Sequence, residues 1–98
     1  MINLLFLLLP FLGPDTDILV VSKSCESCVE AKIIIKKLQD EGYDVIIVSK
    51  RSPIGYRFKV FEVPTLIIRD SESIPEKIVG LLSEDEYRYL INRKQNNE

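Results

Sequence analysis

Two short runs of apolar residues, 18–21 and 45–48, constrain the fold of this chain more than any other feature. Each run consists of Val, Ile or Leu without interruption, which is typical of a strand that is buried on both faces. The segment between the runs is long enough for one helix. A strand, a helix and a strand in this order form a βαβ unit, so we expect the two strands to pair in parallel through a right-handed crossover.

The segment between the two runs has the features of an amphipathic helix. We expect this helix to begin at Ser24 or Cys25 and to end near Gly42, because glycine suits the left-handed backbone that often follows a helix. Its apolar residues, which include Val29 and Ile33, predict a broad face that packs against the sheet. Lysines supply its polar side and favour the C-terminal end of the helix dipole.

The second half of the chain predicts a short helix, two strands and a final helix. Residues 54–58 are long enough only for a short helix. The runs 65–68 and 76–79 predict a β-hairpin around the polar turn between them. Ser83 and Glu86 have the spacing of a capping box, so we expect the last helix to begin there.

Length and composition allow one domain and exclude several kinds of chemistry. The chain has 98 residues, which is the size of a single small domain. Its formal net charge of −2 provides no basic field, so we expect no nucleic-acid partner. It contains no His, which excludes Ser-His-Asp and Cys-His catalytic pairs and His-containing zinc sites. Two cysteines, Cys25 and Cys28, remain as the candidates for chemistry.

Residues 1–14 differ from the rest of the chain, because they are mostly apolar and contain no Lys or Arg. We interpret them as a hydrophobic N-terminal extension to a domain at residues 15–98. The apolar run is shorter than the roughly 20 residues that span a bilayer, and it lacks the basic start of a signal peptide. We therefore expect a cytoplasmic protein that retains the extension. Export or membrane contact through residues 1–13 is one alternative, and an extra element that covers a sheet edge or a dimer surface is another.

Cys25 and Cys28 stand where the first predicted strand leads into the first helix. The unpaired N–H groups at a helix N-terminus favour a thiolate, so we expect Cys25 to be the exposed, attacking thiol. Residues three apart lie on the same face of a helix, so Cys28 can close a disulfide with Cys25 and act as the resolving thiol. A two-residue gap closes almost no chain, so stability does not explain the pair. Redox exchange is the leading interpretation, and half of a metal site is the alternative.

A second motif lies at the start of the third predicted strand, where Val63, Pro64 and Thr65 follow one another. Together with the Cys-Glu-Ser-Cys motif, and with Gly80 after the fourth strand, it resembles the thioredoxin and glutaredoxin superfamily over residues 17–92. The resemblance implies a thioredoxin-like α/β fold, with a mixed four-stranded sheet in the order 2-1-3-4 and helices on both faces. It also implies a cis peptide bond before Pro64 and a substrate-binding role for these three residues, in which the Val63 backbone pairs with an extended substrate segment.

By this resemblance the protein is a thiol-disulfide oxidoreductase that exchanges a Cys25–Cys28 dithiol with protein or small-molecule disulfides. Its redox group is the disulfide itself, with no other bound cofactor and no metal, and glutathione is an alternative co-substrate. The expected partners are a disulfide-containing protein and a reductase or glutathione, and the expected state is a monomer or a weak dimer. Two alternatives remain open. One is a redox-inactive thioredoxin-like module that binds a protein, and the other is a metal or iron–sulfur site shared across a dimer.

Overall fold

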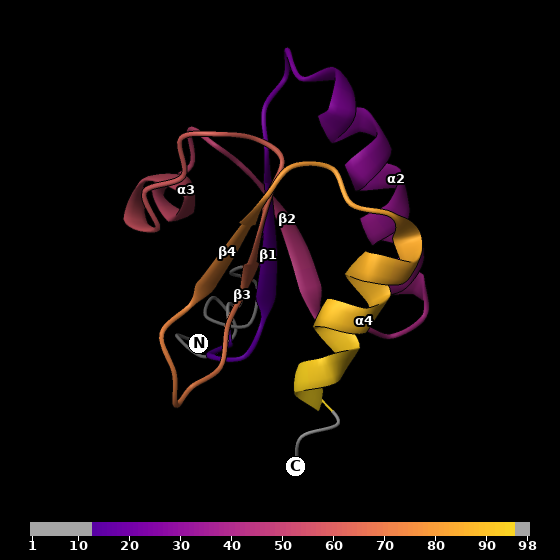
Figure 1. The fold of residues 1–98 in the computed structure, drawn as a ribbon. Coiled ribbons are helices and arrows are strands. Elements are labelled where there is room, and N and C mark those ends of the chain that lie inside the picture. Colours follow the sequence, from indigo (N-terminus) through magenta and orange to yellow (C-terminus); the bar gives the residue numbers. More distant parts are fainter. Residues whose placement is uncertain (1–12, 96–98) are drawn as a thin grey trace, which may run out of the picture.

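The computed structural model describes residues 13–95, which contain one four-stranded sheet and three helices (Figure 1). In chain order the elements are β1 (Asp17–Val21), α2 (Glu26–Asp40), β2 (Val45–Ser49), α3 (Pro53–Arg57), β3 (Thr65–Ile68), β4 (Glu76–Val79) and α4 (Glu84–Gln95). The sequence predicted each of these elements, and their predicted bounds differ from the observed ones only at the ends.

The sheet is mixed and has the strand order β2-β1-β3-β4. β1 pairs in parallel with β2, so that Ile18 lies opposite Ile46. β1 is antiparallel to β3, and β3 is antiparallel to β4, with Thr65 opposite Val79. The predicted strand order and the parallel pairing through a helical crossover are therefore confirmed. Both central strands, β1 and β3, are buried along their whole length.

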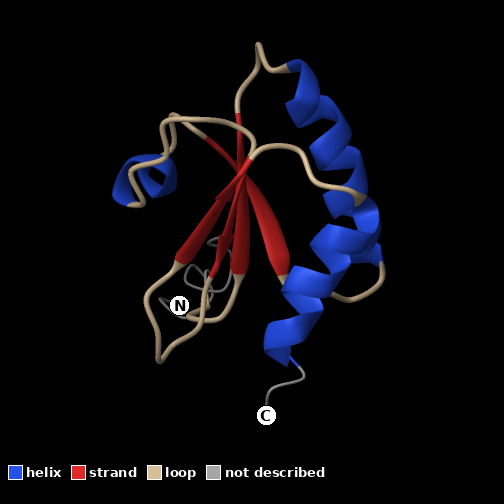
Figure 2. Cartoon of the chain, in the orientation of Figure 1, coloured by secondary structure: helices blue, strands red, loops and turns tan. Residues whose placement is uncertain are grey.

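Helices cover both faces of the sheet, as predicted (Figure 2). α2 and α4 lie on one face, and α3 lies on the other (Figure 1). Alternate residues of β1 divide between the two layers. Leu19 packs in a cluster with residues of α2 and α4, whereas Ile18 packs with Ile54 and Phe58 from the α3 side. Because β1 and β3 are antiparallel neighbours, the end of β1 lies beside the start of β3. The loop after β1 and the loop before β3 therefore meet at the same end of the sheet.

The buried face of α2 differs from the expected one. Its buried residues form a single stripe with a spacing of three and four residues, namely Cys28, Ala31, Ile35 and Leu38. Val29 and Ile33 are instead 55% and 65% exposed, so the prediction that places them on the packed face is wrong. The helix has more apolar residues than one face holds, and their pattern does not indicate which stripe turns inward. β2 was likewise expected to be fully buried, but it is an edge strand and is buried only at Val45.

Local interactions fix the ends of α2 and α4. Gly42 follows α2 in the left-handed conformation, with φ of +98°. The predicted capping box is confirmed, because the Glu86 N–H donates to Ser83 Oγ at 3.2 Å and the Ser83 N–H donates to a Glu86 carboxylate oxygen at 2.9 Å. The bond from the Ser83 N–H holds the pKa of the Glu86 carboxyl below its ordinary value. Arg88 of α4 joins the two helices through an ion pair with Glu41, at the end of α2, at 2.9 Å.

Most of the predicted N-terminal extension, residues 1–14, lies outside the described residues. The described chain begins at Gly13, whose carbonyl oxygen accepts a hydrogen bond from the Arg69 guanidinium at 2.9 Å. Arg69 directly follows β3, so this bond ties the start of the described chain to the sheet. Within residues 13–95, no helix is both long enough and apolar enough to cross a membrane.

Candidate active site

Cys25 occupies the N-cap position of α2, in the loop that leaves β1. Its backbone is extended, with φ of −122° and ψ of 108°, which is usual for an N-cap. Its sulfur takes the place of the usual capping oxygen, because the Cys28 N–H donates to Cys25 Sγ at 3.1 Å. The N-terminus of the helix thus points an N–H group at this sulfur, and it stabilises negative charge there.

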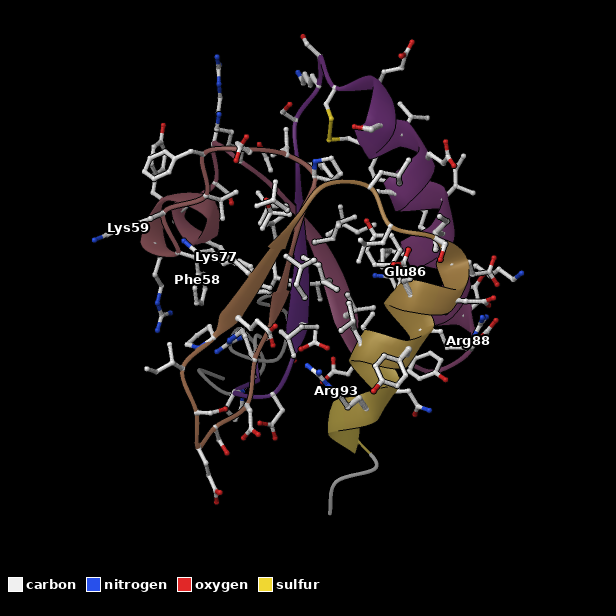
Figure 3. All side chains as sticks on the ribbon, viewed as in Figure 1. Phe58, Lys59, Lys77, Glu86, Arg88 and Arg93 are labelled. Carbon is white, nitrogen blue, oxygen red and sulfur yellow. A yellow bond between two sulfur atoms is a disulfide. The ribbon has the colours of Figure 1, made fainter. Side chains whose placement is uncertain are left out.

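Cys25 and Cys28 form a disulfide, with 5.1 Å between their Cα atoms (Figure 3). The two residues differ in burial, because Cys28 is fully buried and Cys25 is partly exposed. The difference arises because Cys28 begins the buried stripe of α2, whereas Cys25 stands before the first helical turn. Cys25 is therefore the sulfur that a second molecule can reach.

The segment before β3 faces the disulfide. Cys25 Sγ lies 3.8 Å from the carbonyl oxygen of Val63, and the Val63–Pro64 peptide bond is cis. Pro64 and Thr65 are buried, and Thr65 Oγ1 donates to the Glu62 carbonyl at 2.5 Å, which fixes the backbone on either side of the cis bond. Val63 is partly exposed, so it is the one of these three residues that a substrate can approach. The five residues predicted for the site thus lie together at one end of the sheet, where β1 ends and β3 begins.

Gly80 supports this segment from the end of β4. The Gly80 N–H donates to the Pro64 carbonyl at 2.8 Å, and its φ of +103° is a conformation that suits glycine. The neighbouring side chains of Val79 and Leu81 are exposed, so they form apolar surface on either side of Gly80. Sequence reasoning singled out Gly80 but missed these two side chains, although their position on either side of the glycine was a usable signal.

Ser27 is another residue that sequence reasoning did not assign to the site. Its hydroxyl oxygen lies 3.6 Å from Cys25 Sγ. A disulfide sulfur has no proton to donate, so the Ser27 hydroxyl is the donor in this contact. The same hydroxyl can donate to a Cys25 thiolate after the disulfide is reduced. The signal in the sequence was the place of Ser27 between the two cysteines, in the first turn of the helix.

The motif has no resident metal in its oxidised form, since its two sulfurs are bonded to each other. Among the described residues, no group of three or more His, Cys, Asp or Glu side chains is arranged to hold a metal ion. A tetrahedral site needs about four ligands, so a metal on this motif would require a reduced dithiol and ligands from outside the described part of the chain.

The chain matches no protein-family model and no curated protein. Solved structures are similar to it. A single-substitution mutant of thioredoxin from Halobacterium salinarum is 23% identical, with a TM-score of 0.67 over 85% of this chain and 76% of that one. A thioredoxin-like protein from Clostridium perfringens is 21% identical, with a TM-score of 0.67 over 85% of this chain and 72% of that one. Thioredoxin-2, a component of the malaria parasite's protein secretion machinery, is 21% identical, with a TM-score of 0.62 over 80% and 82% of the two chains.

These similarities define the class of fold. The fold is thioredoxin-like, as the two motifs predicted. This chain is a version in which the described residues form four strands and three helices, with a Cys25–Cys28 disulfide at the N-terminus of α2. Identities near 20% carry the fold alone, so the activity has to be argued from the site itself.

Proposed function

We propose that the protein is a thiol-disulfide oxidoreductase. The observation that carries the proposal is the unequal burial of the two sulfurs of the Cys25–Cys28 disulfide at the N-terminus of α2. An exposed nucleophile and a buried partner within one helical turn are what a two-step exchange requires. A disulfide that served stability would close a longer loop than this one, whose sequence separation is 3.

The reaction begins with the reduced dithiol. The Cys25 thiolate attacks one sulfur of a substrate disulfide, which forms a mixed disulfide and releases the other substrate sulfur as a thiolate that takes up a proton. Cys28 then loses its proton and attacks Cys25 Sγ. This step forms the Cys25–Cys28 disulfide and releases the second substrate sulfur, so two electrons and two protons pass from the dithiol to the substrate. A second dithiol, or two molecules of a monothiol, returns the protein to its reduced form by the reverse steps.

The surrounding groups assist the first attack. The Cys28 N–H, at 3.1 Å, and the Ser27 hydroxyl, at 3.6 Å, stabilise negative charge on Cys25. The Val63 backbone offers its N–H and C=O to an extended substrate segment, in a pairing that is largely independent of the substrate's side chains. Pro64 and Thr65 hold that backbone in place, because both are buried.

We extend the proposal to the partners of the reaction, namely a disulfide-containing protein as substrate and a reductase or glutathione as reductant. The exposed apolar side chains of Val79 and Leu81 support a protein substrate, which can cover them on binding. A dithiol that donates electrons needs a compartment that keeps thiols reduced, so the proposed location is the cytoplasm. The proposed oligomeric state is a monomer or a weak dimer.

Reduction of insulin, or of a small disulfide, by the prereduced chain tests the proposal. We expect Cys25→Ser to lose the activity, because the attacking sulfur is gone. We expect Cys28→Ser to trap a mixed disulfide with the substrate, seen as an added mass that dithiothreitol removes. Ser73→Ala changes an exposed hydroxyl in the turn before β4, so this control should keep the wild-type rate. Equal activity of Cys25→Ser and wild type would contradict the mechanism and favour the redox-inactive binding module.

A further inference from the structure

A pocket of about 270 Å³ lies on the α3 side of the molecule, between the end of β2 and the loop after α3. Its lining includes three basic residues, Lys50, Arg51 and Lys59, and two aromatic residues, Tyr56 and Phe61. We refer to it as the basic pocket. The side chains of Tyr56 and Phe61 are 72% and 77% exposed, so both rings are available to a second molecule.

The positive charge of the basic pocket is not balanced within the described part of the chain. None of its three basic residues forms an ion pair there, whereas Lys37, Arg88 and Arg93 each pair with a carboxylate. Residues 50–61 contain four basic and no acidic residues, although the chain has a net charge of −2. A local field of one sign in an acidic domain attracts an anionic group to that place.

The backbone at Lys59 is held in a conformation that few lysines adopt. Its φ is +55°, in the left-handed region, where Gly or Asn is less strained than Lys. Two hydrogen bonds hold this backbone, one from the Lys59 N–H to the Tyr56 carbonyl at 3.1 Å and one from Lys77 Nζ to the Lys59 carbonyl at 3.4 Å. Figure 3 shows the Lys59 side chain pointing outward from this loop, with Lys77 and Phe58 close by. These bonds therefore fix the backbone from which the Lys59 side chain extends beside the pocket.

The basic pocket lies at the same end of the strands as the disulfide, namely where β1 and β2 end. Lys50 follows β2, and its N–H donates to the carbonyl of Val21, the last residue of β1, at 2.7 Å. β1 leads directly into the loop that carries Cys25. Phe61 stands two residues before Val63, so their Cα atoms lie within about 7 Å of each other. A substrate segment that pairs with Val63 and runs toward Phe61 reaches the pocket about two to four residues from its reacting cysteine.

We propose that the basic pocket binds a carboxylate side chain of the substrate, an Asp or Glu that stands near the disulfide attacked by Cys25. This inference rests on the proposed function and names its substrate class, namely protein segments with an acidic residue beside a disulfide. The basic side chains attract the carboxylate, and the rings of Tyr56 and Phe61 cover the apolar part of the segment. Gly55 allows α3 to approach the end of β2, because a Cβ at this position would clash with the Lys50 carbonyl.

Two synthetic peptides test this inference with the full chain in its reduced form. They contain the same disulfide and the same sequence, except that one has Glu and the other Gln three residues from the reacting cysteine. The measured quantity is the ratio of their kcat/KM values. We expect wild type to prefer the Glu peptide by about twofold to tenfold at low ionic strength, and we expect high salt to abolish the preference, because the charges are exposed to solvent.

Charge-neutralising variants locate the effect. Arg51→Gln and Lys59→Gln each remove one positive charge from the pocket, and each should bring the ratio toward one. Lys36→Gln is the matched control, because it removes the same charge from an exposed position on α2, across the sheet from α3. This control should leave the ratio unchanged. Bis(2-hydroxyethyl) disulfide, which is small and neutral, reports the oxidoreductase activity without a carboxylate.

The outcomes distinguish a failure of the carboxylate site from a failure of the proposed oxidoreductase activity. Reduction of the neutral disulfide, together with equal rates for the two peptides, would overturn the carboxylate site and leave the oxidoreductase in place. Failure of wild type to reduce any of the three compounds would refute the proposed function itself. An equal loss of preference in Lys36→Gln would assign the effect to net charge and overturn the site. A short single-stranded oligonucleotide that inhibits more strongly than a disulfide-free acidic peptide would assign the pocket to phosphate and overturn the proposal as well.

Discussion

Gly42 and Gly80 allow the backbone at the site to be tested separately from the stability of the fold. Both residues have a left-handed backbone, with φ of +98° and +103°, and a Cβ added at either one meets no atom within 4 Å. Alanine therefore causes backbone strain without a steric clash at both positions, which costs about 1–2 kcal/mol of folding free energy. Since Tm falls by roughly 4–8 °C per kcal/mol in a domain of this size, both variants should be destabilised to a similar and measurable extent.

Only Gly80→Ala should also slow disulfide exchange. The Gly80 N–H donates to the Pro64 carbonyl at 2.8 Å, and Pro64 follows the residue whose backbone faces the disulfide. Alanine keeps the N–H, but a shift of the backbone that relieves the strain lengthens this hydrogen bond. Weakening the bond costs up to about 0.5–1.5 kcal/mol, which corresponds to a rate that is lower by up to about twofold to tenfold. Gly42 follows the C-terminal end of α2, at the opposite end from the dithiol, so Gly42→Ala should reduce a disulfide at the wild-type rate.

Urea unfolding and the rate of insulin reduction well below the unfolding midpoint measure the two effects in the same preparations. The reasoning is refuted if Gly42→Ala slows reduction as much as Gly80→Ala does, because the slowing would then follow from lower stability alone. It is also refuted if both variants unfold at the wild-type urea concentration, because the strain assigned to the left-handed backbone would then be absent.

Three further predictions concern single side chains. Ser27→Ala should slow the alkylation of reduced Cys25 by iodoacetamide about twofold to tenfold at neutral pH, since the thiolate loses one hydrogen-bond donor, and an unchanged rate would remove Ser27 from the site. Ser83→Ala should lower the free energy of unfolding by about 1 kcal/mol at neutral pH. The Ser83 backbone N–H donates to the Glu86 carboxylate and lowers its pKa. The contribution of this bond is present above the unfolded pKa of Glu86, and urea unfolding of wild type should show it fading as the pH falls through the lowered pKa. Burial raises the pKa of Tyr87, so wild type should lose stability as the pH rises above about 10, and Tyr87→Phe should lose less in the same titration.

The sequence predicts the order of the elements because the signals for them are local. The runs 18–21 and 65–68 have no polar face, and they are the two central, fully buried strands. The rotation of α2 about its axis is not a local property, because apolar residues surround most of the helix. Only contact with the sheet and with α4 decides that Ile35 is buried while Ile33 is exposed. The apolar run of β2 is like that of β1, and only the strand order leaves β2 at the edge.

The dithiol can be predicted from local spacing, whereas the basic pocket depends on how separate segments of the chain come together. Cys25 and Cys28 come together through the geometry of one helical turn, which their spacing specifies directly. Lys50 and Lys59 line one pocket only because α3 returns the chain to the end of β2. Isolated basic residues are usually solvated, and nothing in the spacing of these two lysines marks a shared site. Sequence reasoning was therefore able to predict the dithiol from four residues, and it was unable to predict the pocket beside it.

The unequal burial of the two sulfurs of the site follows from the packing of α2. Cys28 is the first residue of the buried stripe that continues through Ala31 and Ile35, so the contacts that hold the helix also keep this sulfur away from external disulfides. It can react with a mixed disulfide on Cys25, which helix geometry places next to it. Cys25 stays outside the core because it precedes the first turn, where its sulfur caps the Cys28 N–H. The proposed exchange still requires Cys28 to lose its proton before it attacks, and in a chain without His the acceptor of that proton is not an imidazole.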